Sequence, residues 1–224
     1  MANCAYLSIW SKGFTETTML EQLEQVLKTV PFSAQRPGFT ELLIRAVDPA
    51  EAPLLERDLR SRPLDAAELV ELLREHRNSD SAYEIQTHWD LWTFDAARGT
   101  WRLGPQGLRI VCHGEEYDSG VCPEVGNFQA DIGFEHLFTG HAGLLGVRPN
   151  AVREPQHPAE AHFLAVMAQP ENLRAYHEKT CENIRKLMDW VRAIEEQLPV
   201  ARYQLWSEGE ENFEAWLDEI LAVR

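Results

Sequence analysis

Residues 81–91 read SAYEIQTHWDL, and apolar and polar side chains alternate along them. The apolar parity holds Tyr83, Ile85, Trp89 and Leu91, and the polar parity holds Glu84, Gln86, His88 and Asp90. Successive side chains of a β-strand point to opposite faces of the sheet. This stretch therefore predicts a half-buried strand, which is typical of antiparallel sheets with one wet face.

The segments after this strand predict further strands of the same kind. Residues 95–100 contain Gly99 and indicate a hairpin connection into 101–103, and residues 104–107 indicate a second turn into 108–112. Residues 128–135 again alternate apolar and polar side chains. Together they predict an antiparallel meander in the middle of the chain.

Amphipathic helices are predicted on both sides of the meander. Apolar side chains recur at three and four residues in segments that cover 18–29, a stretch from 65, 158–168, 170–198 and a stretch from 211. Thr18 with Glu21 and Asp65 with Glu68 have the spacing of capping boxes. Shorter strands are expected at 5–10, 39–47 and 200–206. The predicted fold class is α+β, a mainly antiparallel sheet packed against amphipathic helices.

The prolines suggest how the chain is organised. Residues 148–158 contain Pro149, Pro155 and Pro158 and few apolar side chains, which indicates a linker. We expect an α+β domain with the central meander at 1–147. Residues 148–224 are expected to form a helical segment with a short strand, packed on the same domain.

The two ends of the chain resemble each other. Residues 8–13 (SIWSKG) and 204–209 (QLWSEG) agree in three of six positions, and each lies between a predicted strand and a predicted helix. The similarity indicates either two related strand-helix units around Trp10 and Trp206 or a shared local chemistry. In both cases Gly13 and Gly209 are expected to supply a positive φ at the turn.

The charge of the chain limits its partners. The 224 residues carry a formal net charge of −15, and such a balance repels nucleic acid and anionic lipid. Attraction of a basic protein and simple solubility are both compatible with it. No apolar run reaches the roughly 20 residues of a membrane span, and the N-terminus lacks the pattern of a signal peptide. The four cysteines form no CxxC pair, so reduced thiols and a cytoplasmic location are expected.

An acidic segment is the main sign of function. Residues 110–147 hold six acidic side chains and no Lys or Arg, which indicates a binding face. We expect Trp92 or Trp101 to be apolar anchors on this face. The charged rim would consist of Glu115, Glu116, Asp118 and Glu124. A small, acidic, tryptophan-rich α+β protein of this kind is similar in general character to the immunity proteins that neutralise bacterial toxins, which implies a non-enzymatic protein with a basic protein partner.

The motifs of common enzyme classes are absent from the sequence. It contains no G-x-S-x-G turn, no G-x-x-x-x-G-K-[ST] loop and no G-x-G-x-x-G helix start, so no cofactor is predicted. Cys112 and Cys122 have no basic neighbour in sequence and are expected to be inert thiols.

Two alternatives to the protein-binding hypothesis remain. Asp131, Glu135, His136 and His141 lie within eleven residues and could form a pocket between sheet and helices, as in a small-ligand-binding protein or an enzyme. Their spacing does not match a familiar metal motif, so no metal is predicted. A structural role in a homo-oligomer is the third hypothesis, because the long helix and an exposed sheet edge could both pair with a second copy.

Overall fold

The computed structural model describes residues 3–46, 52–95, 98–141, 143–145 and 157–223. Its centre is one seven-stranded sheet in the order β3-β2-β4-β5-β6-β1-β7, and every neighbouring pair is antiparallel. The strands are β1 (Cys4–Ser11), β2 (Glu41–Arg45), β3 (Leu55–Asp58), β4 (Ala82–Asp95), β5 (Thr100–His113), β6 (Phe128–Phe134) and β7 (Val200–Ser207). The predicted α+β class is confirmed.

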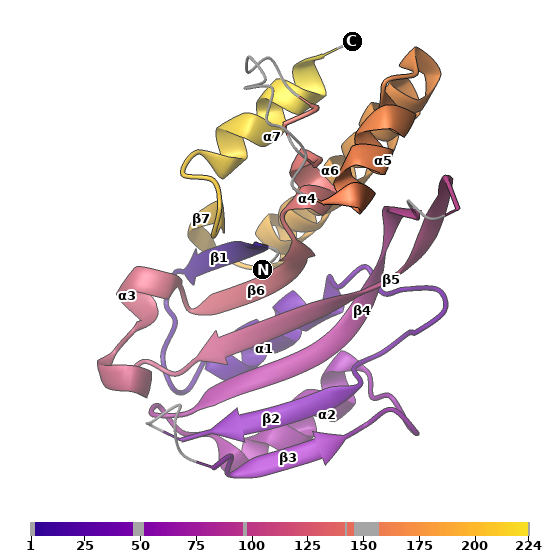
Figure 1. The fold of residues 1–224 in the computed structure, drawn as a ribbon. Coiled ribbons are helices and arrows are strands. Elements are labelled where there is room, and N and C mark those ends of the chain that lie inside the picture. Colours follow the sequence, from indigo (N-terminus) through magenta and orange to yellow (C-terminus); the bar gives the residue numbers. More distant parts are fainter. Residues whose placement is uncertain (1–2, 47–51, 96–97, 142, 146–156, 224) are drawn as a thin grey trace.

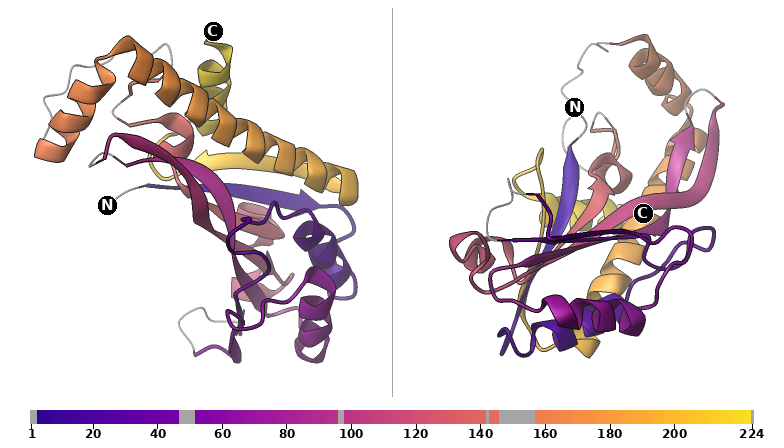
Figure 2. Two further views of the ribbon diagram at one scale, coloured as in Figure 1. Left: turned by 90° about the vertical axis from the view of Figure 1, so that its right-hand side faces the viewer. Right: turned by 90° about the horizontal axis from the view of Figure 1, so that it is seen from below.

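The helices are distributed unequally over the two faces of this sheet. The α-helices of the described residues are α1 (Met19–Lys28), α2 (Ala66–Leu73), α3 (Cys122–Val125), α4 (His136–Thr139), α5 (Pro158–Met167), α6 (Pro170–Gln197) and α7 (Phe213–Ala222). Short 3₁₀ helices, η1 (Arg74–His76) and η2 (Tyr117–Ser119), complete the set. In Figures 1 and 2, α1 and α2 lie on one face of the sheet. No described helix covers the opposite face of β2 and of the β4–β5 pair, except at the far end of the hairpin, where Phe94 contacts α5 and Trp101 contacts α6.

The long helix α6 connects the parts of the fold. It contacts α1, β4, α4, α5 and α7, and its buried positions include Ile184, Leu187 and Trp190. Although α6 has 28 residues, neither it nor any other described helix is long and apolar enough to cross a membrane. The helix instead spans the domain and buries one stripe of side chains against the sheet.

The alternation in residues 81–91 holds in the structure. Tyr83, Ile85, Trp89 and Leu91 are fully buried under the helices, and the residues of the other parity are partly exposed. On the wet face, Arg109 of β5 lies 3.6 Å from Asp131 of β6 and 3.9 Å from Glu84 of β4. Arg45 of β2 pairs with Glu84 as well. A ladder of charges therefore crosses four strands on this face.

The predicted turn at residues 104–107 is wrong. β5 continues through it, and β4 pairs with β5 over their whole length, from Ala82 opposite His113 to Asp95 opposite Thr100. β6 pairs with β5 only between Arg109 and Cys112, so the part of β5 around Pro105 has no strand of the described residues on its second side. Proline is tolerated on a free edge because no partner strand needs its missing N–H.

Two of three smaller expectations about turns and helix caps need correction. The Thr18 side chain does not cap α1, because its Oγ1 accepts from the Thr15 N–H at 2.9 Å and donates to the Gly13 carbonyl at 2.8 Å. The Asp65–Glu68 capping box is present on α2. Gly13 has φ +65°, but Gly209 is not in the positive-φ region. A Cβ at 209 would lie 1.9 Å from the Asn3 amide nitrogen, so a larger residue there would require the exposed Asn3 side chain to move.

The two similar chain ends lie side by side. β1 pairs with β7, and Ser8 lies opposite Gln204, its equivalent in the sequence alignment of the two ends. Tyr6 stacks on Trp206 at 4.3 Å between ring centroids, and the guanidinium carbon of Arg202 lies 3.8 Å from the Trp10 ring. Residues 200–207 are thus part of the same sheet as residues 4–11, while most of the predicted linker lies outside the described residues.

Candidate functional site

An aromatic cavity of about 540 Å³ lies between the far end of the β4–β5 hairpin and helices α4, α5 and α6. Its aromatic walls are Trp92, Phe94, Trp101, Phe134, Phe163 and Tyr176, together with the imidazoles of His136 and His141. We call this the aromatic cavity. Its lining side chains come from the strands β4, β5 and β6 and from the helices α4, α5 and α6, and Phe134 is the last residue of β6.

Ring contacts join the walls of the aromatic cavity. His136 and His141 stack at 4.1 Å between centroids with an angle of 17° between their planes. His141 meets Phe163 edge-on at 5.5 Å, and Phe163 meets Tyr176 edge-on at the same distance. Trp101 then contacts Tyr176 at 5.4 Å. Such contacts hold each ring in one orientation, so the walls are largely preformed.

The short helix α4 brings the two histidines together. α4 begins at His136, one residue beyond the end of β6, and ends at Thr139, and its C-cap residue Gly140 has φ +79°. A Cβ on Gly140 would approach the Leu145 side chain at 3.0 Å and the Tyr176 ring at 3.2 Å, so glycine permits the close approach. The backbone N–H of His141 donates to the Tyr176 hydroxyl at 2.8 Å. This bond positions the second histidine above the first.

Asn183 fixes α6 against the hairpin. Its Oδ1 accepts from the Trp92 N–H at 2.8 Å, and its Nδ2 donates to the Trp92 carbonyl at 3.0 Å and to the Leu137 carbonyl at 2.9 Å. The amide takes the place that a neighbouring strand would have beside β4. It thereby ties the hairpin, α4 and α6 to one another at the inner end of the aromatic cavity.

The outer wall at Trp92 is held by charged side chains. The indole N–H donates to Glu182, and the Lys179 ammonium lies 3.9 Å from the centre of the Trp92 ring. Lys179 also pairs with Glu182 at 2.7 Å. The hydrogen bond from Lys179 is the main reason that the pKa of Glu182 is lowered. One face of the indole is therefore covered by a cation.

Three titratable side chains of the aromatic cavity, His136, His141 and Tyr176, have pKa values shifted toward their uncharged forms, and the carboxyl side chain of Glu160 also lines the cavity. Burial and, to a smaller extent, the neighbouring His141 lower the pKa of His136 to about 4. Burial also lowers the pKa of His141, against the opposite effect of Glu160. Burial raises the pKa of Tyr176 to about 12. A neutral imidazole offers one hydrogen-bond donor and one acceptor, so the two rings can form hydrogen bonds with a ligand without carrying a net charge.

The predicted His/carboxylate pocket is brought together only in part. His136 and His141 line the aromatic cavity, but Asp131 lies on the wet face of the sheet beside Arg109. Glu135 precedes α4, and its buried Oε2, which has no hydrogen-bond partner among the described residues, lies 2.6 Å from where a Cβ on Gly209 would be. Both carboxylates therefore point elsewhere. Within the described ranges, no three His, Cys, Asp or Glu side chains are grouped as a metal site requires.

The two halves of the predicted protein-binding face lie far apart. Trp92 and Trp101 line the aromatic cavity, whereas the four rim residues lie on the connection between β5 and β6 at the opposite end of the hairpin (Figure 1). Trp101 and Glu115 are separated by most of β5, roughly 45 Å at the rise of an extended strand. All four rim side chains are exposed, namely Glu115, Glu116, Asp118 and Glu124. The anchors and the rim cannot form one compact contact.

Several cavity residues are not predicted from the sequence. Phe94, Phe134, Phe163 and Tyr176 are absent from the expected site because each looks like ordinary core in its own segment. One signal was available in α6, where Tyr176, Thr180 and Asn183 are spaced by four and three residues on one helix face and are buried. Buried Thr and Asn on an otherwise apolar stripe indicate a special contact.

No protein-family model, no curated protein and no solved structure matches this chain.

Proposed function

We propose that this protein is a binding protein and that the aromatic cavity is its ligand site. The observation that supports this is the convergence of six aromatic side chains and two uncharged imidazoles on one cavity of about 540 Å³. Small-molecule sites are typically concave, mainly apolar hollows of roughly 300–1,000 Å³ with a few polar groups and perturbed pKa values.

The walls indicate the kind of ligand. Aromatic rings favour a flat apolar or aromatic group, which they contact through faces and edges. The neutral imidazoles of His136 and His141 can accept a hydrogen bond from a hydroxyl or an amide N–H, or donate one. An isolated carboxylate would lose its hydration without gaining a cation from these two rings. We therefore expect a mainly apolar ligand with one or two neutral polar atoms.

A panel of small probes tests the proposal. Indole, phenol, benzyl alcohol and benzoate are titrated into the isotope-labelled full chain, and amide and tryptophan side-chain shifts are followed by NMR. The proposal predicts saturable shifts at Trp92, Trp101 and the neighbours of His136, with the neutral probes binding more tightly than benzoate. Shifts spread over the whole surface, or confined to residues outside the aromatic cavity, would reject it.

A second candidate function is toxin neutralisation or another interaction with a basic protein. It is supported by the exposed acidic connection between β5 and β6 and by the net charge of −15. Opposite charges on two partners mainly raise the association rate. The four cysteines, Cys4, Cys112, Cys122 and Cys181, are free thiols, which supports the accompanying expectation of a reducing, cytoplasmic compartment.

Asp118 and Glu124 are the side chains to change in testing this second candidate. Glu115 accepts from the Glu16 N–H and Glu116 accepts from the Ser79 hydroxyl, so changes there would also disturb the fold. The variant Asp118→Asn/Glu124→Gln should slow association with a basic protein captured from the native lysate and reduce its salt dependence. Glu196→Gln, an exposed change at the end of α6, is the control. Equal association rates for both variants would exclude this face.

A further inference from the structure

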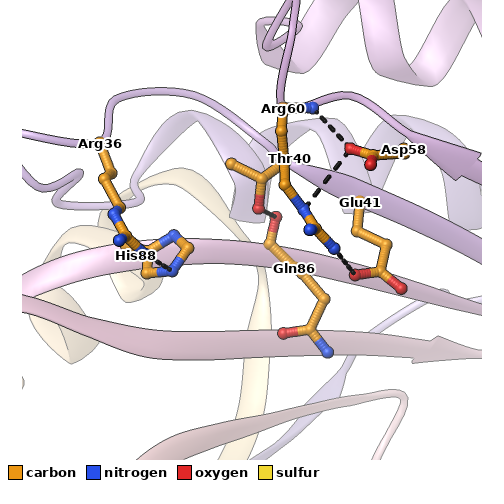
Figure 3. A network of polar contacts seen from close by, with 7 residues as sticks. All are labelled: Arg36, Thr40, Glu41, Asp58, Arg60, Gln86 and His88. Carbon is orange, nitrogen blue, oxygen red and sulfur yellow. Dashed lines mark hydrogen bonds and ion pairs between the residues drawn. The ribbon is translucent and has the colours of Figure 1, made fainter.

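A second cavity, of about 620 Å³, opens on the wet face of the sheet and is independent of the aromatic cavity. Its charged lining residues are Arg36, Glu41 and Arg60, and its other side chains include Gln86 and His88. We call it the arginine pocket. Figure 3 shows Arg36 reaching from the loop before β2 to the His88 ring on β4, and Arg60 reaching toward Glu41 on β2.

The contact between Arg36 and His88 fixes the state of the imidazole. Nη1 of Arg36 lies 3.2 Å from Nε2 of His88 (Figure 3). A guanidinium can only donate, so Nε2 accepts and the proton of the neutral ring is on Nδ1. Burial lowers the pKa of His88, and the charges of Arg36 and Arg60 lower it further, which favours this neutral form.

His88 is consequently left with an unused donor. Its Nδ1 is buried and has no hydrogen-bond partner among the described residues. A buried donor without a partner is unfavourable, and a water molecule or a bound acceptor that reaches Nδ1 would offset this cost. The acceptor would have to be compatible with two guanidinium groups nearby.

Both arginines keep unused donors. Within the described part of the chain, the Arg36 guanidinium contacts only the neutral His88 ring and has no carboxylate within 4.0 Å. Arg60 lies 3.7 Å from Glu41 and 3.5 Å from Asp58, both longer than a hydrogen bond. The two carboxylates balance part of the positive charge, and Arg36 remains as an uncompensated cation in a chain of net charge −15.

A glycine keeps the floor of the arginine pocket open. Gly107 of β5 lies opposite His88, and a Cβ built on it would meet no heavy atom within 4 Å. The position does not require a positive φ, so a side chain could be added without backbone strain. Gly107 therefore gives a way to fill the pocket while leaving both arginines in place.

From these contacts we infer a second binding site, the arginine pocket, which accepts an oxyanion group, a carboxylate or a phosphate, between Arg36, Arg60 and His88. This inference goes beyond the proposed function and does not depend on it. Guanidinium groups present paired N–H donors that match both kinds of oxyanion. The Nδ1–H of His88 is buried in the protein alone, so it adds a donor only when the ring shifts toward the bound anion.

Titrations with inorganic phosphate and with acetate test this site. Each salt is added to the full-length protein at constant ionic strength, with chloride as the balancing ion, and the arginine Nε–H and Gly107 amide signals are followed by NMR. We expect saturable shifts at Arg36, Arg60 and Gly107 with at least one of the two salts, and the salt that responds identifies the oxyanion. Losing a charged hydrogen bond is worth about 1.5–3 kcal/mol, so Arg36→Gln should weaken binding by roughly 10-fold to 100-fold.

Two further variants make the test decisive. Arg192→Gln is the control, because Arg192 is as exposed as Arg60 (71% against 70%) and pairs with Asp189 on α6. It should bind like the wild type, whereas Gly107→Val, which keeps every charge, should bind at least about tenfold more weakly. Absence of saturable shifts with both salts, equal binding by Arg36→Gln and Arg192→Gln, or wild-type binding by Gly107→Val would each overturn the inference.

Discussion

At the scale of single residues, Asn183 has the most direct influence on the aromatic cavity. The side chain is 3% exposed and makes three hydrogen bonds to backbone groups of Trp92 and Leu137. In Asn183→Leu these backbone groups lose their partners inside the protein. We expect a loss of about 3 kcal/mol in the free energy of unfolding, measured by urea denaturation.

Asn172 provides a matched control for this change. It also lies on α6, but its side chain makes one hydrogen bond, to the Val166 carbonyl at 2.9 Å, and is only partly buried. Asn172→Leu should cost about 1 kcal/mol. If the two variants lost the same free energy, the proposed role of the Asn183 amide would be wrong.

His136 gives a pH-dependent prediction. Its pKa is about 4 in the folded protein, below the 6.5 of an unperturbed histidine, so the unfolded chain binds the proton first as the pH falls. The contribution of the neutral His136 ring to the free energy of unfolding is fully present above pH 6.5 and declines as the pH falls from 6.5 to about 4. The decline amounts to at most about 3 kcal/mol.

His136→Phe separates this effect from other acid-sensitive groups. Phenylalanine keeps a flat ring beside Phe134 and His141 and has no proton to gain. The difference between the unfolding free energies of wild type and His136→Phe should therefore shift in favour of the variant as the pH falls from 6.5 to 4. A constant difference over this range would contradict the prediction, because it would show that the pKa of His136 is the same in the folded and the unfolded protein.

At the scale of elements, the β4–β5 hairpin determines where both cavities lie. The two strands form fourteen residue pairs, and the part beyond β6 extends past the sheet to meet α5 and α6 (Figure 2). Local turn chemistry at residues 104–107 predicts a break here, because the sequence contains two glycines and a proline. Continuous pairing with β4 keeps residues 104–107 in an extended strand despite this local tendency, and that pairing cannot be seen in the local sequence.

The connection between β5 and β6, which carries the acidic rim, is sterically constrained at Gly114. A Cβ on Gly114 would lie 2.2 Å from the Ser79 carbonyl oxygen and 2.9 Å from that of Ser81, both backbone atoms that cannot move freely. Gly114→Ala should therefore lower the unfolding free energy by about 3 kcal/mol in a denaturant titration.

Gly104→Ala is the matched control for Gly114→Ala. The nearest atom to a Cβ at Gly104 is Nε of the Arg102 side chain at 3.4 Å, which can move away. This variant should change stability by less than about 1 kcal/mol. A small effect at Gly114 as well would mean that the connection is looser than the structure indicates.

At the scale of the whole molecule, the strands and helices could be predicted from the sequence better than the two cavities. Strand and helix periods are local, so β4, β6, α2, α5 and α6 could be located from residue spacing alone. The strand β3 could not, because only Leu55 of its four residues is apolar.

The two cavities depend on contacts between distant segments. Phe94 and Phe163 are 5.8 Å apart between ring centroids although 69 positions separate them in the chain. Two of the four residues of the predicted pocket, His136 and His141, could be identified because they are close in sequence and the fold keeps them together. No periodicity predicts that Asp131 lies beside Arg109 on the wet face of the sheet whereas Glu135 lies beside Gly209.

The central claim is that the aromatic cavity binds a ligand, and Thr180 tests it directly. Thr180 lines the aromatic cavity and is 3% exposed, so a longer side chain there occupies ligand space. The dissociation constant of the strongest neutral probe is measured by calorimetry for the wild type, Thr180→Met and the equal-volume control Thr180→Val. We predict that Thr180→Met binds at least about tenfold more weakly and that Thr180→Val stays within about threefold of the wild type. Wild-type affinity in Thr180→Met would contradict the claim.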